Sequence, residues 1–339
     1  MKTINSKTLP DPPRVIPTLV AGFDVVTNHI WLLLFPFGLD VLLWLGPHFR
    51  LKNLIESWMS MMLQSFQSIQ DMTDMSEMIE VTQTGWSFVA ERFNILMTVR
   101  SYPVGIPSLM LSRWPIEVPW GDRLIVDVSS IGSAFLLFGA CALVGILGGT
   151  LYFSLVARAA LFDQVRWRKV LALWPRASLH VILLTFLWFL LLLGILVPIS
   201  CGASFLLLMG ISASSIAALL FGSLFIWLAF PLLFSPHGIF VYHNPVWTSV
   251  RKSIRVVRMT LPATALFFIA ILILGQGLDL LWQISSEDSW LMLISLMGHA
   301  FTSTGFLSAS FIYYQEADVW VESMLEEVLE KESTSDTTA

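Results

Sequence analysis

Six apolar segments, each long enough to cross a membrane as a helix, constrain this chain more than any other feature. About 20 residues of α-helix span the roughly 30 Å hydrocarbon core of a bilayer. Only helices and closed barrels satisfy every backbone hydrogen bond in lipid. We therefore predict an all-α integral membrane protein with six transmembrane helices, the third bent or broken at Pro198. The predicted spans are 29–46, about 130–156, about 178–200, about 212–235, 261–283 and about 289–313.

The amino-acid composition supports a membrane protein. Of 339 residues, 56% are hydrophobic and only 13% are charged, about half the charged fraction of a soluble domain. The 14 Trp and 24 Phe fit the enrichment of aromatic side chains where helices cross lipid interfaces. Cys141 and Cys201 lie inside apolar runs, which indicates neither a disulfide framework nor a metal site.

The distribution of basic residues orients the predicted bundle. Short cytoplasmic loops carry an excess of Lys and Arg, and the segments 157–177 and 237–260 are the basic ones here. The short segment 285–289, SSEDS, between the last two spans carries only acidic charges. We therefore predict a multi-pass protein of the plasma (inner) membrane, with the N-terminus and the C-terminus in the cytoplasm.

A basic helix stands directly before the fifth span, in the segment 237–260. In a helix, Val250, Ile254 and Val257 share one stripe, and arginines form another beside it. This pattern predicts an interfacial helix with its apolar side toward the acyl chains. Three roles stay open: a topology anchor, binding of anionic lipid, and docking of a partner or of the tail. The residues proposed for headgroup binding or tail docking are Arg251, Lys252, Arg255, Arg258, Arg166, Arg168 and Lys169.

The remaining segments complete the predicted organisation. Residues 1–28 form a cytoplasmic N-terminus with an interfacial helix, and 47–129 form a small extracytoplasmic cap of amphipathic helices and a Pro-rich loop. Residues 130–315 hold spans two to six, in which spans two–three and four–five look like related hairpins. The acidic cytoplasmic tail, 316–339, has an apolar stripe that includes Val321 and Leu325, so we expect an amphipathic helix that docks on the basic segments.

The segment PLLFSPHGIFVYHNPVWTSVRKSIRVVRM, together with Tyr313–Tyr314 before the charged tail, carries a family resemblance. Over about 130–315 the chain resembles bacterial membrane proteins grouped with the membrane domain of glycerophosphodiester phosphodiesterases. The catalytic domain of those enzymes is a separate soluble barrel. This chain has neither its length nor its acidic and histidine motifs, so the resemblance implies a membrane domain without the enzymatic activity.

Polar side chains inside predicted spans are costly and normally face protein or water. Asp40 lies in the first span, Asp279 in the fifth and His299 in the sixth, with Gln276 one turn from Asp279. Their functional interpretation is a proton- or cation-linked transporter built on these residues. The alternative is a structural role, in which a backbone group or a Trp N–H satisfies each carboxylate.

Small residues on the second span indicate close helix packing. Gly145 and Gly149 are four residues apart, so one face is nearly bare, and we expect another helix there, within the chain or across a homodimer. No metal or cofactor motif is present, since His237 and His243 lack a third ligand nearby. The basic residues lie at membrane depth, which argues against nucleic-acid binding.

A remote alternative is an intramembrane serine protease of the rhomboid type, with Ser204 in a Gly-x-Ser-x pattern and His299 in the sixth span. The second span lacks a His or Asn to hold an oxyanion, and Thr302 stands where a glycine should follow the histidine. The sequence therefore favours a non-enzymatic membrane protein that handles lipid or small solutes in the envelope, or scaffolds a membrane complex. The transporter is the main alternative.

Overall fold

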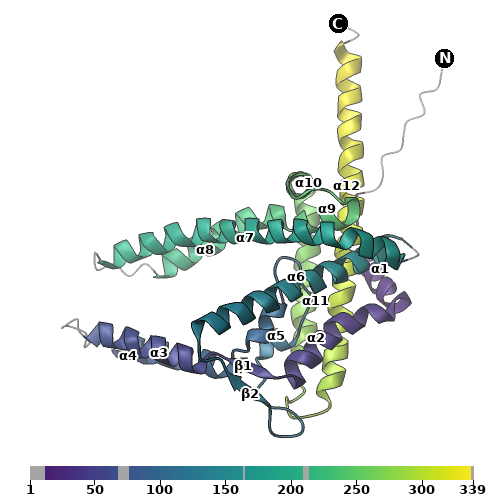
Figure 1. The fold of residues 1–339 in the computed structure, drawn as a ribbon. Helices are drawn as coiled ribbons and strands as arrows, with labels where there is room; N and C mark the ends of the chain where they lie inside the picture. The colour runs from purple at the N-terminus through teal and green to yellow at the C-terminus, as the bar shows by residue number, and fades with distance from the viewer. Residues whose placement is uncertain (1–11, 68–75, 163–164, 209–213, 337–339) are drawn as a thin grey trace, which may run out of the picture. The chain divides into compact units, whose positions relative to one another are not determined.

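A computed structural model of the chain describes residues 12–67, 76–162, 165–208 and 214–336 (Figure 1). The chain divides into two compact units. Unit 1 comprises Met1–Ile30, Phe153–Leu274 and Thr304–Ala339, and unit 2 comprises Trp31–Tyr152 and Gly275–Ser303. The elements are α1 (Val15–Asn28), η1 (Ile30–Leu33), α2 (Leu34–Leu45), β1 (His48–Arg50), α3 (Lys52–Gln67), α4 (Ser76–Arg92), η3 (Ile95–Val99), α5 (Met110–Arg113), β2 (Ile125–Asp127), α6 (Ile131–Leu161), α7 (Trp167–Leu208), α8 (Ser214–Ala229), η4 (Phe230–Leu232), α9 (Ser235–Tyr242), α10 (Val246–Met259), α11 (Leu261–Trp282) and α12 (Met292–Asp336).

The described chain is mostly helical, and four of its helical segments are long and apolar enough to cross a membrane: Ile131–Leu161, Trp167–Leu206, Ser215–Tyr242 and Leu261–Trp282. These correspond to the predicted second, third, fourth and fifth spans. A fifth candidate arises only if α1 and the segment Ile30–Leu45 are counted together, and these two are bent by 92°. The structure thus supports a helical membrane protein with four or five candidate spans.

The predicted first and sixth spans differ from the other four for physical reasons. A break at His29 separates α1 from η1 and α2, and η1 with 4 residues and α2 with 12 reach only about 24 Å together. The predicted sixth span is the first part of α12. This part of α12 has more polar residues than the four candidate spans and is not among them. Its polar side chains are largely buried: Ser295, His299, Thr302, Thr304, Ser308 and Ser310.

Two other expectations concern helix continuity. The predicted break at Pro198 is not observed. α7 runs for 42 residues and contains both Pro175 and Pro198. Neighbouring groups re-satisfy the backbone at such prolines in apolar helices. The predicted tail helix is confirmed, since α12 continues to Asp336.

In unit 2 the predicted cap segment 47–129 contains two helices, α3 and α4, that lie side by side (Figure 1). Trp58 and Trp86 join them with ring centroids 5.2 Å apart. The segment also contains a two-stranded parallel sheet of β1 and β2, which departs from the all-α prediction. Each strand has three residues, too few for a sequence pattern to reveal. Arg50 and Asp127 form an ion pair across it.

The glycine face of α6 is covered by the end of the 3₁₀ helix η3 and by the loop after it, not by a long α-helix. A Cβ at Gly145 would lie 2.1 Å from the carbonyl oxygen of Val99, and one at Gly149 would lie 2.7 Å from the Cα of Gly105. Both contacts are with η3 and the Pro-rich loop that follows it. The predicted close approach is therefore confirmed, with the chain's own segment in unit 2 as the neighbour, and contact with a second copy stays a prediction.

In unit 1, α10 packs against α9 and η4. Ser249 Oγ donates a hydrogen bond to Ser235 O (2.7 Å), and Ser253 Oγ donates one to Pro231 O (2.7 Å). Val250 is buried with Leu184 and Ile239. The prediction that the apolar stripe of α10 faces the acyl chains is therefore wrong. Hydropathy cannot tell a stripe that meets lipid from one that meets another helix, and here protein covers it.

We expect the double substitution Gly145→Leu/Gly149→Leu to lower the folded yield in detergent and the melting temperature, because side chains there must displace backbone atoms. Overpacking of this kind costs about 1–3 kcal/mol or more. Gly139→Leu is the matched control, since nothing lies within 4 Å of a Cβ at Gly139 on the same helix. Equal melting temperatures for the two variants would contradict the described loop contact.

Candidate functional site

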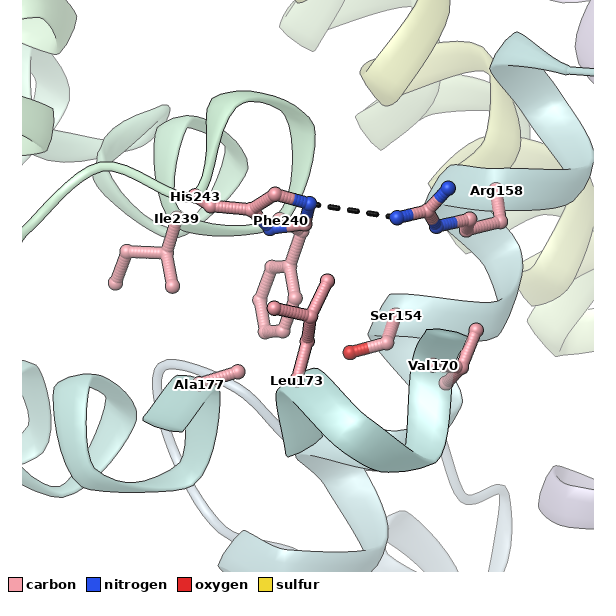
Figure 2. Close-up of a pocket in the computed structure, with 8 residues that line it drawn as sticks. All are labelled: Ser154, Arg158, Val170, Leu173, Ala177, Ile239, Phe240 and His243. Atoms are coloured by element: carbon pink, nitrogen blue, oxygen red, sulfur yellow. Dashed lines mark hydrogen bonds between the residues drawn. The ribbon is translucent and has the colours of Figure 1, made fainter. Parts of the chain in front are cut away.

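A small cleft in unit 1 brings polar and apolar side chains together at the ends of three helices (Figure 2). Its lining residues come from the last turns of α6, the first turns of α7, and α9 with the residue that follows it. They are Ser154, Arg158, Val170, Leu173, Ala177, Ile239, Phe240 and His243. A second depression shares Leu173, Ala177, Ile239 and His243 with the first and adds Arg176, His180 and Asn244.

The sharp end of α9 places His243 at this cleft. His243 follows the last helical residue in the left-handed conformation, with φ of 55°. The backbone N–H of Asn244 then donates to Gly238 O at 3.3 Å, and Pro245 prevents the helix from continuing. A non-glycine residue with this backbone is uncommon and often lies at a functional position.

Arg158 and His243 point toward each other across the cleft, with Arg158 Nη2 and His243 Nε2 3.4 Å apart (Figure 2). Burial lowers the pKa of His243, and the positive charges of Arg158 and Arg176 lower it further. The imidazole is therefore neutral at physiological pH and can accept from the guanidinium. Figure 2 also shows the Ser154 hydroxyl directed into the cleft.

The polar groups of the two depressions are suited to an anion. Arg158 and Arg176 supply positive charge, and neither lining set contains a carboxylate. The side-chain nitrogen of Asn244 is buried without a hydrogen-bond acceptor. Leucine, isoleucine, valine and phenylalanine side chains form the rest of the walls. Each depression has a volume of about 10 Å³, room for about one water, so an anionic group would lie at the mouth of the cleft with its apolar chains along the apolar side chains beside it.

The elbow cations predicted from the sequence lie elsewhere in unit 1. Arg251, Arg255 and Arg258 are exposed on α10, and the Arg251 guanidinium lies over the Trp247 ring at 5.2 Å. Arg166, Arg168 and Lys169 are exposed at the start of α7. The sequence does not indicate that Arg158 and His243 meet, because Arg158 is one of several cations in a basic segment and His243 is six residues from His237 with no third ligand nearby. The His-Asn-Pro sequence after a short helix is the signal that marks the left-handed turn.

Lys252 of α10, one of the residues proposed for headgroup binding or tail docking, contacts the acidic tail. Its Nζ lies 3.2 Å from an Asp318 carboxylate oxygen and 2.8 Å from one of Glu322, both on α12, and it lies over the Tyr242 ring at 4.6 Å. We call Tyr242, Lys252, Asp318 and Glu322 the tail cluster. Burial alone would lower the pKa of Lys252, but the Glu322 and Asp318 carboxylates outweigh it and raise the pKa. Lys252 therefore stays charged through neutral pH.

The tail cluster should depend on Asp318 more than on Glu322. The Asp318 side chain is 4% exposed and that of Glu322 is 54% exposed. Removing one partner of a buried pair costs about 3–5 kcal/mol, whereas an exposed pair contributes about 0.2–1 kcal/mol. We therefore expect Lys252→Met to make the tail clearly more sensitive to proteolysis. We expect Glu322→Gln to increase its sensitivity only slightly, by about as much as high salt does in the wild type. A tail equally resistant in wild type and Lys252→Met would rule out the contact.

The intramembrane residues predicted from the sequence fall in unit 2, where Asp40 and the Asp279–His299 pair make different hydrogen bonds. His299 Nδ1 lies 2.9 Å from Asp279 Oδ1, so these two residues meet as expected. Asp40 is instead used by the Pro-rich loop, since its carboxylate accepts hydrogen bonds from the Ser108 hydroxyl and from the backbone N–H groups of Leu109 and Met110.

The geometry thus assigns Asp40 a structural role, while Gln276 is exposed. His299 Nε2 is buried without a hydrogen-bond partner. The protease dyad of His299 with Ser204, a residue of unit 1, stays a prediction. Among the described residues, no group of three or more His, Cys, Asp or Glu side chains is arranged to hold a metal ion.

Comparison of the chain with family models, curated proteins and solved structures gives no match. The function therefore has to be argued from the geometry of this chain.

Proposed function

We propose that this is a non-enzymatic, multi-pass membrane protein that binds the headgroup of an anionic phospholipid at the mouth of the cleft of unit 1. The observation that carries the proposal is that Arg158 and Arg176 line two adjoining depressions that share apolar residues and have no carboxylate in either lining. The family resemblance predicted for 130–315 is compatible with a role in lipid handling.

The basic surface around the cleft supports the same ligand class. The exposed arginines of α10 and the exposed cations at the start of α7 attract an anionic leaflet, at about 1 kcal/mol per Lys or Arg near the surface. Lys252 pairs with two acids of the tail and offsets one of their two negative charges, which weakens the repulsion between those carboxylates and the lipid. The protein would thus hold anionic lipid at one face of the membrane, or present it to a partner complex in the envelope.

The lipid proposal predicts a charge-specific loss of binding. Phosphatidylglycerol and phosphatidylcholine of equal chain length are titrated into the full chain in detergent, and lipid adducts are counted by native mass spectrometry. A hydrogen bond to a charged group contributes about 1.5–3 kcal/mol, so we expect Arg158→Gln to weaken phosphatidylglycerol binding at least about tenfold. Arg92→Gln, on α4 in unit 2, is the control, because Arg92 lies outside the basic surface of unit 1. Equal occupancy by both lipids in wild type, or equal loss in both variants, would overturn the proposal.

The finer topology is part of the proposal. We infer six membrane crossings with both termini in the cytoplasm, which places the basic segments and the cleft inside. The support is the concentration of cations in 157–177 and 237–260 and the acids of 285–289.

The orientation predicts which introduced cysteines an impermeant thiol reagent reaches in intact cells. In a background without Cys141 and Cys201, Ser112→Cys should be labelled from outside and Thr248→Cys should be protected until the membrane is permeabilised. Both side chains are exposed in the structure, so burial does not explain a difference. Labelling of Thr248→Cys in intact cells would reverse the topology.

Proton- or cation-linked transport is the second candidate function, favoured by the Asp279–His299 pair. Its side chains are 32% and 10% exposed, so the pair lies at the edge of unit 2. In proteoliposomes with a pH-sensitive dye, we expect a wild-type proton flux that Asp279→Asn abolishes and that Gln276→Leu, one turn away, leaves intact. Equal proton flux in protein-free vesicles and in vesicles that contain the wild-type protein would exclude this candidate.

A further inference from the structure

A second cavity lies in unit 2, far along the chain from the cleft residues. It has a volume of about 140 Å³ and is lined by His48, Arg50, Glu91, Ile116, Arg123 and Ile125. The parallel pairing of β1 and β2 places His48 opposite Ile125, and the backbone N–H of His48 donates to Leu124 O at 2.8 Å. Two three-residue strands thus bring residues from the two ends of the cap segment to one wall.

His48 is the unusual member of this cavity. Its side chain is buried, with 2% of the residue exposed. Neither ring nitrogen makes a hydrogen bond of good geometry, and only the backbone of Glu91 interacts weakly with the ring among the described residues. Burial lowers the pKa of His48 to about 4, with further lowering by the charges of Arg123 and Arg50. The ring is therefore neutral at physiological pH and carries one N–H donor. Leaving a buried donor unpaired costs about 1–3 kcal/mol, which a ligand in the cavity would recover.

Arg123 supplies positive charge at the same wall. Its guanidinium donates to the backbone carbonyls of Gly46, Pro115 and Leu43, which fixes its position. Burial lowers the pKa of Arg123 to about 10, and the charge of Glu287 partly offsets this, so the side chain remains charged. Within the described parts of the chain, no carboxylate is ion-paired with it.

The other charges of the cavity are balanced. Arg50 pairs with Asp127, and Lys52 lies 3.5 Å from a carboxylate oxygen of Glu91. The cavity therefore presents one fixed cation, one neutral donor, and the apolar side chains of Ile116 and Ile125. Glu91 disfavours a dianion such as phosphate. A planar carboxylate matches the donor fork of an arginine, and a short alkyl chain matches the two isoleucines.

We infer that the His48–Arg123 cavity binds a short-chain monocarboxylate, with the carboxylate at His48 and Arg123 and the alkyl chain at Ile116 and Ile125. The site is independent of the proposed lipid cleft, because none of its residues lines that cleft. In the proposed topology it faces the outside, so the cap would sense or collect a small acid there.

The test uses the full chain in detergent and sodium propionate as the probe. Saturation-transfer NMR reads the transfer of magnetisation from protein to the propionate methyl group, with inorganic phosphate as the comparison anion. We expect millimolar propionate binding, at least a tenfold loss in His48→Leu, and little competition by phosphate. Glu91→Gln should retain or tighten binding, because it removes the one carboxylate of the lining.

Melting temperatures without propionate show whether both variants fold. If His48→Leu is unfolded, the comparison of Glu91→Gln with wild type still decides, since weaker binding in Glu91→Gln contradicts the charge argument. Absence of transfer to propionate in wild type, unchanged binding in a folded His48→Leu, or stronger binding of phosphate than of propionate would each overturn the inference.

Discussion

Backbone carbonyl groups in an apolar setting must find a donor, and this requirement organises unit 1. η4 contains Pro231 and the first turn of α9 contains Pro236, and neither proline supplies an N–H for a continuous helix. Ser253 and Ser249 of α10 donate to the carbonyls of Pro231 and Ser235. These two hydrogen bonds hold α10 across the irregular segment and orient α9. The cleft and the tail cluster both depend on that arrangement, since His243 ends α9 and Lys252 lies on α10.

The serine hydrogen bonds also explain why the arginines of α10 lie on one side of the helix. Ser249, Ser253, Val250, Val256 and Val257 are buried, so the arginines must occupy the opposite, exposed side of the helix. Lys252 lies between the two sides, with its side chain 24% exposed, and reaches the tail. One helix thus presents a basic surface outward and a single cation to its own acidic tail.

The sequence predicts the parts of this fold that follow from local periodicity. Four apolar runs become long helices, and the spacing of Val321 and Leu325 predicts the helical tail. What covers an apolar stripe depends on tertiary packing, which explains the error for α10. The partners of Asp40 lie 68 to 70 residues away in the chain, beyond any local pattern. The cleft forms where the ends of three helices meet, and such a tertiary arrangement leaves no local pattern in the sequence.

The length of α7 has a practical consequence. Its 42 residues extend about 63 Å, twice the thickness of a hydrocarbon core, and α8 lies alongside it (Figure 1). Leu179, Phe186, Phe189 and Leu196 of α7 and Leu219 and Trp227 of α8 all have at least half of their surface exposed. Detergent or lipid must therefore cover α7 and α8 in any purified sample. The detergent belt would therefore contribute unusually heavily to the hydrodynamic size, and an apparent mass from gel filtration would overstate the number of protein copies.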